Sequence, residues 1–91
     1  MSGPPVWFVY LLRCADGSLY CGITTDPARR LAEHNGAGEA GARYTRGRRP
    51  VELVYQEPQP SRAAASRREA ELKRMRRGAK LVLAGSGAAP R

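Results

Sequence analysis

"VWFVYLLRCADGSLYCGIT", residues 6–24, is the stretch that decides the fold. Residues 6–14 are apolar, aromatic and β-branched, and residues 19–24 have the same character, which is typical of β-strands. The ADGS segment between them carries residues that favour tight turns. The sequence therefore predicts a β-hairpin.

The length of the hairpin loop decides which side chains share a face of the sheet. A two-residue turn would place Tyr10 and Tyr20 on opposite faces, because side chains alternate along a strand. A three-residue loop that ends in a left-handed Gly17 would place both tyrosines on one face. The residues of the hairpin allow both registers. In the second, Cys14 and Cys21 face opposite sides, which argues against a disulfide between them.

Four segments follow the hairpin, and their patterns predict a helix, a basic glycine-rich loop, a third strand and a long helix: residues 26–35, 36–50, 51–56 and 61–77. Asp26 and Ser61 are good N-cap residues for the two helices. We expect Pro58 and Pro60 to break the chain after the third strand, and Gly78 to separate a short last helix.

This order predicts an α+β fold, in which a small three-stranded antiparallel sheet is flanked by helices (β-β-α-β-α, then a short last helix). We expect one domain over residues 6–83, because a chain of 91 residues can bury only one modest core. The ends, 1–5 and 84–91, are expected to be a flexible N-terminus and a disordered tail.

The charge of the chain indicates a polyanionic partner. Sixteen Lys and Arg against eight Asp and Glu give a net charge of +8, which favours nucleic acid. A membrane surface fits less well, because the basic segments lack large apolar residues. Two cysteines and one histidine are too few for a disulfide framework or a zinc site. With no apolar run near the roughly 20 residues of a membrane span, and no signal-peptide pattern, we expect a cytoplasmic protein.

Arg30 and His34 stand four residues apart in the first predicted helix, so they lie on one of its faces. Tyr20 lies on the strand that leads into this helix, two residues before Gly22. An arginine and a histidine in this spacing, taken alone, are more often a solvated basic face than a site.

Glu69 is unusual in the long helix. It shares a side with Ala65, Leu72 and Met75, which have the spacing of a packing face. A carboxylate there is costly unless it has a partner. That partner is either an arginine in a salt bridge or a hard divalent cation, Mg²⁺ or Mn²⁺, which binds carboxylate oxygens.

These groups together suit phosphodiester cleavage, which needs a base for water, a cation for the developing charge and a metal ion. His34 or a tyrosine would be the base, Arg30 the cation and Glu69 the metal ligand. Four basic residues of the loop, and a tyrosine that could stack on bases, would contact DNA: Arg43, Tyr44, Arg46, Arg48 and Arg49. A solvated basic loop explains each of them equally well.

Five features resemble, in order and spacing, the motifs of the GIY-YIG endonuclease family: FVY (8–10), YCG (20–22), Arg30, His34 and Glu69. The sequence is most similar to the small stand-alone bacterial members, the UPF0213 group, which have look-alikes of "RRLAEHN", "ARYTRGRRPVELVY" and "REAELKRM". The resemblance covers roughly residues 6 to 83. It implies a metal-dependent endonuclease that hydrolyses DNA phosphodiester bonds in repair, recombination or processing.

The resemblance also implies a role for each matching residue: the motif tyrosines Tyr10 and Tyr20, a glycine close to the site at Gly22, the phosphate-binding Arg30, His34, and the metal ligand Glu69. The base differs among members, between the residues matching Tyr10 and His34. Because the family site uses both motif tyrosines, the resemblance implies the three-residue hairpin loop.

Three positions depart from the family pattern. Phe8 replaces the first-motif glycine, Cys21 replaces an isoleucine, and Ile23 stands where some relatives have a lysine, which removes one possible phosphate contact. Larger members of the family carry a DNA-targeting domain, and with 91 residues we expect none here. We therefore expect weakly sequence-specific cleavage of branched or single-stranded DNA, or guidance by a targeting protein. The alternative is a non-catalytic basic nucleic-acid-binding module on the same scaffold.

Overall fold

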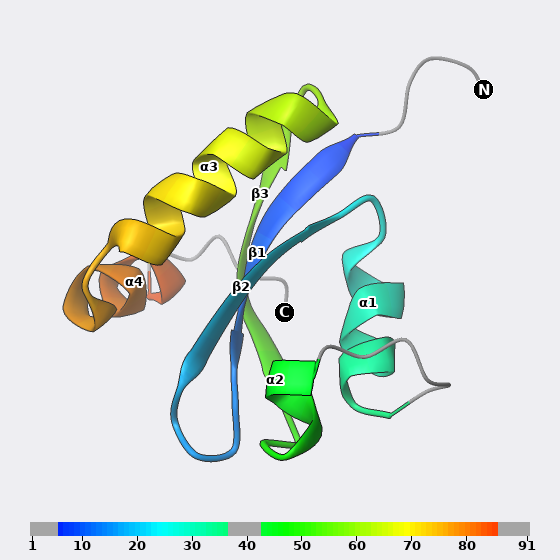
Figure 1. Cartoon of the computed structure of the whole chain (residues 1–91), viewed down its shortest axis with the longest axis vertical. Helices are drawn as coiled ribbons and strands as arrows, with labels where there is room; N and C mark the ends of the chain where they lie inside the picture. Colours follow the sequence, from blue (N-terminus) through cyan, green and yellow to red (C-terminus); the bar gives the residue numbers. More distant parts are fainter. Residues whose placement is uncertain (1–5, 37–42, 86–91) are drawn as a thin grey trace.

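The computed structural model describes residues 6–36 and 43–85. It contains seven elements in these residues: β1 (Trp7–Arg13), β2 (Leu19–Thr24), α1 (Pro27–His34), α2 (Arg43–Arg46), β3 (Glu52–Gln59), α3 (Arg62–Arg74) and α4 (Arg77–Ala84). The strands form one antiparallel sheet in the order β2-β1-β3. Helices α1 and α2 lie on one side of this sheet, and α3 and α4 lie on the other (Figure 1). The α+β fold class predicted from the sequence is confirmed.

The hairpin between β1 and β2 has the three-residue loop. The amide of Cys14 donates a hydrogen bond to the carbonyl of Ser18 at 2.8 Å. Gly17 has a φ of 85°, a left-handed conformation that glycine adopts without the clash of a Cβ atom. In this register Tyr10 and Tyr20 share a face, as the family resemblance implied.

Two hydrophobic clusters form, one on each face of the sheet. The cluster on the α3 side contains Val9, Leu11, Cys21, Tyr55, Ala65 and Leu72. The cluster on the α1 side contains Tyr10, Leu12, Cys14 and Val51. Cys14 and Cys21 lie in different clusters, so the prediction that they face opposite sides of the sheet in this register is confirmed.

Strand β3 is longer than predicted. It continues to Gln59, and Pro58 pairs with Phe8 of β1 instead of breaking the chain. The reason is that β3 is an edge strand with β1 as its one neighbour in the sheet. A proline, which has no N–H to donate, is tolerated in an edge strand when its nitrogen faces away from the neighbour.

The break between the last two helices lies at Met75 and Arg76, and the prediction that Gly78 causes it is wrong. Helix α3 ends at Arg74, earlier than expected, and Gly78 lies inside α4. Met75 and Arg76 have extended backbone, with ψ of 147° and 155°. This bend lets Met75 and Leu83 pack against the same cluster on the α3 side.

Two remaining expectations concern the ends. The predicted flexible N-terminus, 1–5, lies outside the described residues, as do 86–91 of the predicted tail. Ala84, expected in that tail, is the last residue of α4. In the described part of the chain, no helix is long and apolar enough to cross a membrane.

Candidate active site

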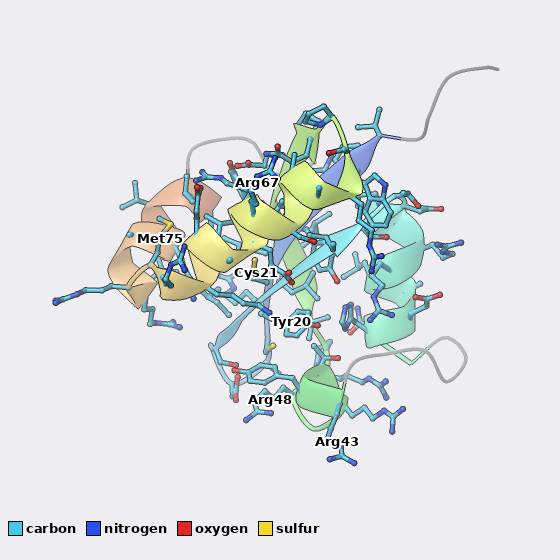
Figure 2. The ribbon with its side chains drawn as sticks, turned by 45° about the horizontal axis from the view of Figure 1, so that its top comes forward. Tyr20, Cys21, Arg43, Arg48, Arg67 and Met75 are labelled. Atoms are coloured by element: carbon cyan, nitrogen blue, oxygen red, sulfur yellow. The ribbon has the colours of Figure 1, made fainter. Side chains whose placement is uncertain are left out.

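Four aromatic rings from four elements meet on the α1 side of the sheet: Tyr10 of β1, Tyr20 of β2, His34 of α1 and Tyr44 of α2. The centroid of the Tyr20 ring lies 5.0 Å from that of His34, 6.4 Å from that of Tyr10 and 5.7 Å from that of Tyr44. We call this group the aromatic cluster. Figure 2 shows Tyr20 on the α2 side of β2, whereas Cys21 lies between β2 and α3. The structure thus joins residues that are far apart in the sequence.

His34 is the centre of a buried hydrogen-bonded chain. Its imidazole has an exposed fraction of 0%, its Nε2 lies 3.0 Å from the Tyr10 hydroxyl, and its Nδ1 lies 2.9 Å from the Thr45 hydroxyl. Burial lowers the pKa of His34 to about 4, with a further contribution from the positive charge of Arg30. The imidazole is therefore neutral at pH 7. One ring nitrogen then donates a hydrogen bond and the other accepts one.

The hydroxyl of Tyr10 lies between His34 and Arg30. Burial raises the pKa of Tyr10 to about 12, although the nearby Arg30 guanidinium opposes this shift. Tyr10 is therefore a phenol at neutral pH. Tyr10 can give its proton to His34 without forming a tyrosinate only if it receives a second proton at the same time. Proton transfer at this position therefore involves both residues.

Arg30 is held as a cation at the margin of the cluster. Its Nη1 donates to a carboxylate oxygen of Glu33 at 3.0 Å. Burial alone would lower the pKa of Arg30, but hydrogen bonding with Glu33 and Tyr10 outweighs burial and raises it. A partly buried guanidinium next to a phenol can stabilise an anion that arrives there.

Gly22 is required by the position of the Tyr10 ring, which lies across the sheet from it. A Cβ atom on Gly22 would lie 2.6 Å from the Cζ atom of Tyr10, closer than real Cβ contacts come. The motif glycine therefore provides room for a ring, and its own backbone needs no left-handed conformation. This agrees with the expectation that the chain passes close to the site here.

Local sequence signals place the helix that carries His34. Asp26 caps α1 by accepting a hydrogen bond from the amide of Arg29 at 3.1 Å. At the other end, the Asn35 side chain donates to the carbonyl of Val51 and accepts from its amide, at 2.9 and 2.7 Å. The guanidinium of Arg49 also donates to the carbonyl of His34 at 2.6 Å. These contacts tie the end of α1 to the start of β3.

Thr45 is the site residue that the sequence did not reveal. It is completely buried in α2, a four-residue helix that was expected to be loop. A threonine between two exposed residues, Tyr44 and Arg46, gives no sequence signal of burial. Its contact with His34 depends on how α2 packs against α1, and only the tertiary structure provides that.

The basic residues that were predicted to bind nucleic acid differ in their surroundings. Arg43 and Arg46 are exposed on α2. Arg48 lies 4.1 Å above the Tyr44 ring, donates to the Tyr44 carbonyl at 2.8 Å and to the Asp16 carboxylate at 3.1 Å. Arg48, like Arg49, therefore has a structural role in addition to any contact with DNA.

Glu69 lies on α3, which packs against the opposite face of the sheet, so it is not a member of the aromatic cluster. Its side chain is 23% exposed, and one carboxylate oxygen lies 3.4 Å from the Lys73 amine. Burial, with a smaller contribution from the Glu69 charge, raises the pKa of the Cys21 thiol to about 12. The Glu69 carboxylate is therefore near enough to Cys21, the residue after Tyr20 in β2, to affect its thiol.

A metal ion at Glu69 would depend on the substrate. Within residues 6–36 and 43–85, no group of three His, Cys, Asp or Glu side chains is placed to hold a metal. Mg²⁺ commonly uses one or two carboxylates and completes its coordination with water and substrate phosphate. A single glutamate is enough for that kind of site, and Glu69 on α3 is the candidate ligand.

An open groove of about 520 Å³ lies between α1 and β3, on the same side of the sheet. Its lining is mainly apolar, with Phe8, Leu31 and Leu53 among its residues. The ionisable residues in the lining are Asp26 and Glu52, and both are acidic. This groove is therefore unsuited to phosphate, and we assign no part of the reaction to it.

Comparison with known proteins places these residues in a family. A model of the GIY-YIG catalytic domain matches residues 6–81. The UPF0213 protein of Desulfotalea psychrophila is 58% identical over 71 residues, which make up 78% of this chain and 64% of that protein. The UPF0213 protein of Streptococcus sanguinis is 54% identical over 75 residues, 82% of this chain and 84% of that protein.

The fold is also similar to solved structures. The solution NMR structure of the UPF0213 protein BH0048 from Bacillus halodurans has a TM-score of 0.57 and 44% identity. The matched region covers 93% of this chain and 88% of the BH0048 chain. The structure of protein EF2693 from E. faecalis has a TM-score of 0.56 at 40% identity, covering 88% of this chain and 83% of that one.

Proposed function

Because this chain belongs to the GIY-YIG family, a nuclease-type family that acts on nucleic acid, we propose that it is a divalent-metal-dependent endonuclease that hydrolyses DNA phosphodiester bonds. The observation that carries the proposal is the buried chain from Tyr10 through His34 to Thr45, next to the Arg30 guanidinium. A protein that only binds DNA gains nothing from a phenol and a neutral imidazole in contact in a buried position.

The proposed reaction begins when water attacks phosphorus. The Tyr10 oxygen takes a proton from this water while the Tyr10 hydroxyl gives its own proton to Nε2 of His34. Thr45 supports the transfer by accepting a hydrogen bond from Nδ1–H, which keeps Nε2 as the acceptor. Arg30 stabilises the negative charge that builds on the phosphate oxygens. The bond to the leaving oxygen then breaks, and this oxygen takes a proton from solvent water and becomes the hydroxyl end of one strand. His34 loses the proton that it gained and returns to its neutral form.

Glu69 would hold a bound Mg²⁺ or Mn²⁺, which would neutralise charge on the phosphate as a Lewis acid. For this role the carboxylate must exchange its contact with Lys73 for the metal. The exchange is inexpensive, because Lys73 is exposed and an ion pair near the surface contributes about 0.2–1 kcal/mol.

The test measures metal-dependent DNA cleavage by variants of the proposed site. Each is compared with a control variant in which a nearby residue of the same helix is changed. Purified protein is incubated with supercoiled, branched and single-stranded DNA, with Mg²⁺ or Mn²⁺ and then with chelator. Glu69→Gln and Arg30→Ala should each lower the cleavage rate roughly 100- to 1000-fold. Glu71→Gln and Arg29→Ala, which alter the same two helices, should change it less than about twofold.

Cleavage that persists in both Glu69→Gln and Arg30→Ala contradicts the proposed site. A second candidate function is a non-catalytic DNA-binding module in the same place, which the exposed Arg43 and Arg46 favour. It would give salt-sensitive binding without cleavage, unchanged or tighter in Glu69→Gln. For both candidate functions, we propose that the protein acts in the cytoplasm on DNA intermediates of repair or recombination. Either its own surface or a targeting protein would direct it to that DNA.

A further inference from the structure

The aromatic cluster extends from the interior to the surface. Tyr10 is 2% exposed, Tyr20 is half-buried and Tyr44 is 38% exposed, and each ring contacts the next. Tyr44 is among the most exposed large apolar residues in the described part of the chain. The ring at the surface is therefore connected to the proposed catalytic residues by direct contacts.

The outer end of this series is the guanidinium of Arg48. Three contacts fix its plane: the Tyr44 ring at 4.1 Å, the Tyr44 carbonyl and the Asp16 carboxylate. Its side chain is still 39% exposed. A guanidinium that is already held over one ring by these contacts is pre-ordered to accept a second flat group.

This surface is suited to one kind of ligand. Nucleobases stack on aromatic rings and on the planes of arginine guanidinium groups, but only when they are unpaired and have left the helical stack. In a duplex, both faces of a base are covered by its neighbours. Arg43 and Arg46 are exposed on the same short helix as Tyr44, where they can contact the phosphates that flank such a base.

We infer that Tyr44 and Arg48 form a stacking surface for an unpaired base of DNA, and that the enzyme engages a single-stranded segment beside the bond that it cleaves. The inference rests on the proposed function, because Tyr20 connects the stacking surface to that site. Arg48 thus has two roles. It holds α2 to the hairpin loop through Asp16 and its own carbonyl, which accepts from the amide of Ala15 at 2.9 Å, and it presents its plane to the base.

The test measures binding in chelator, so that no cleavage is needed. The probes are a fluorescein-labelled single strand, a duplex of the same length, and a single strand that carries one 2-aminopurine. The wild-type protein should bind the single strand at least roughly tenfold more tightly than the duplex. It should also quench 2-aminopurine, because stacking on an aromatic ring quenches this base.

Three substitutions at two positions distinguish stacking on the ring from charge and from loss of folding. Tyr44→Leu keeps apolar volume and should weaken single-strand binding about tenfold, with less than a twofold change for the duplex. Tyr44→Phe keeps the ring and should restore single-strand binding. Arg48→Lys keeps the charge, loses the plane and should weaken single-strand binding several-fold. Thermal denaturation of each variant shows that it is folded.

The chain contains a matched control. Arg62 lies over the Trp7 ring at 5.6 Å, and these are the first residues of α3 and β1. Both elements begin at the other end of the sheet from α2 (Figure 1). Arg62→Lys should leave single-strand binding unchanged. Equal loss of single-strand and duplex affinity in Tyr44→Leu, or absence of quenching by the wild-type protein, would overturn the inference.

The same measurements distinguish failure of the stacking surface from failure of the nuclease proposal. A preference for single strands and quenching in chelator, without cleavage when metal is added, supports the stacking surface and contradicts the nuclease. Metal-dependent cleavage that is equally fast on single strands and on duplex contradicts the stacking surface and supports the nuclease.

Discussion

The two faces of the sheet bury different chemistry. On the α3 side, the cluster around Leu11, Ala65 and Leu72 is apolar, and the carboxylate of Glu57 lies at its rim with Tyr55 and Arg68. On the α1 side, polar groups are buried within the protein, and those of His34 and Thr45 have no exposure at all. Each of these buried side-chain polar atoms has a hydrogen-bond partner.

This difference separates stability from activity. An apolar cluster stabilises the fold roughly in proportion to the area that it removes from water. A buried polar chain contributes little net stability, because its hydrogen bonds replace hydrogen bonds to water. We therefore assign the apolar cluster on the α3 side to stability and the buried polar chain on the α1 side to the proposed reaction. Glu69, at the edge of the α3 side, is the exception, because the proposed metal would bind there.

The largest expected effect is on the α1 side. Tyr10→Phe keeps the ring and removes the hydroxyl that contacts His34. Cleavage should fall about 1000-fold, or about 4 kcal/mol in the activation barrier, because the proton of water loses its acceptor. The free energy of unfolding should change by only about 1 kcal/mol. Single-turnover cleavage and urea denaturation give the two numbers.

The matched variant on the other side is Tyr55→Phe, which removes a hydroxyl bonded to Glu57. It should leave the cleavage rate within about twofold of the wild-type rate. A large loss of cleavage in both variants would mean that buried hydroxyl groups on both faces of the sheet are needed for cleavage. That result would contradict the separation of stability from activity.

The next effect is on stability and belongs to the α3 side. Leu72 is completely buried, so Leu72→Ala should lower the free energy of unfolding by about 3 kcal/mol. Leu81→Ala removes the same atoms from an exposed residue of α4 and should change it by less than about 0.5 kcal/mol. At a temperature where both variants are folded, their cleavage rates should equal the wild-type rate. A slower Leu72→Ala would show that the two faces are coupled.

Gly22→Ala tests whether the α1 side tolerates crowding. The added methyl group would overlap the Tyr10 ring, so the ring or the strand must shift. We expect a loss of about 2 kcal/mol in stability, together with a large loss of cleavage. The control is Gly47→Ala, because a Cβ atom there meets nothing within 4 Å and its φ is not positive. Full activity in Gly22→Ala would disprove the close approach of ring and glycine.

The smallest effect, over the measured range of pH 7.5 to 5.5, is a pH dependence that arises from His34. Its pKa is about 4 in the folded protein and about 6.5 in the unfolded chain, so only the unfolded chain binds the proton between these values. The free energy of unfolding should fall as pH drops from 6.5 to 4, by at most about 1.4 kcal/mol per pH unit. Above pH 6.5 this contribution is constant.

The measurement is urea denaturation of the wild-type protein and of His34→Gln at pH 7.5, 6.5 and 5.5. The carboxylates titrate in both proteins, so the difference between the two curves reports the histidine. The variant should have the shallower pH dependence. Identical slopes would mean that the imidazole is as exposed to protonation in the folded protein as in the unfolded chain.

Local signals in the sequence predicted the hairpin, the Asp26 cap and the face shared by Ala65 and Leu72, because turns, caps and helical spacing act over a few residues. The register of the hairpin needed the family resemblance, since both turns were compatible with the residues. Pro58 was misjudged because its tolerance depends on which strand lies beside it.

The same limit applies to the candidate site. Tyr10, Tyr20, Arg30 and His34 were selected by motif order, and the structure brings them together. The contact of Thr45 with His34 and that of Arg48 with Asp16 join segments that no short-range pattern relates. Predicting such contacts requires knowledge of the tertiary packing.

The hairpin loop has a consequence for insertions and deletions. The alternation of side chains means that loop length determines, by odd or even count, which residues of β2 face α1. Removing one residue while the turn keeps its three-residue form would slip the pairing of β2 by one residue along β1. The Tyr20 phenol would then face the apolar α3 side and the Cys21 thiol the α1 side. A change of one residue in length at the hairpin tip, far from His34, would therefore be more damaging than most substitutions within the site.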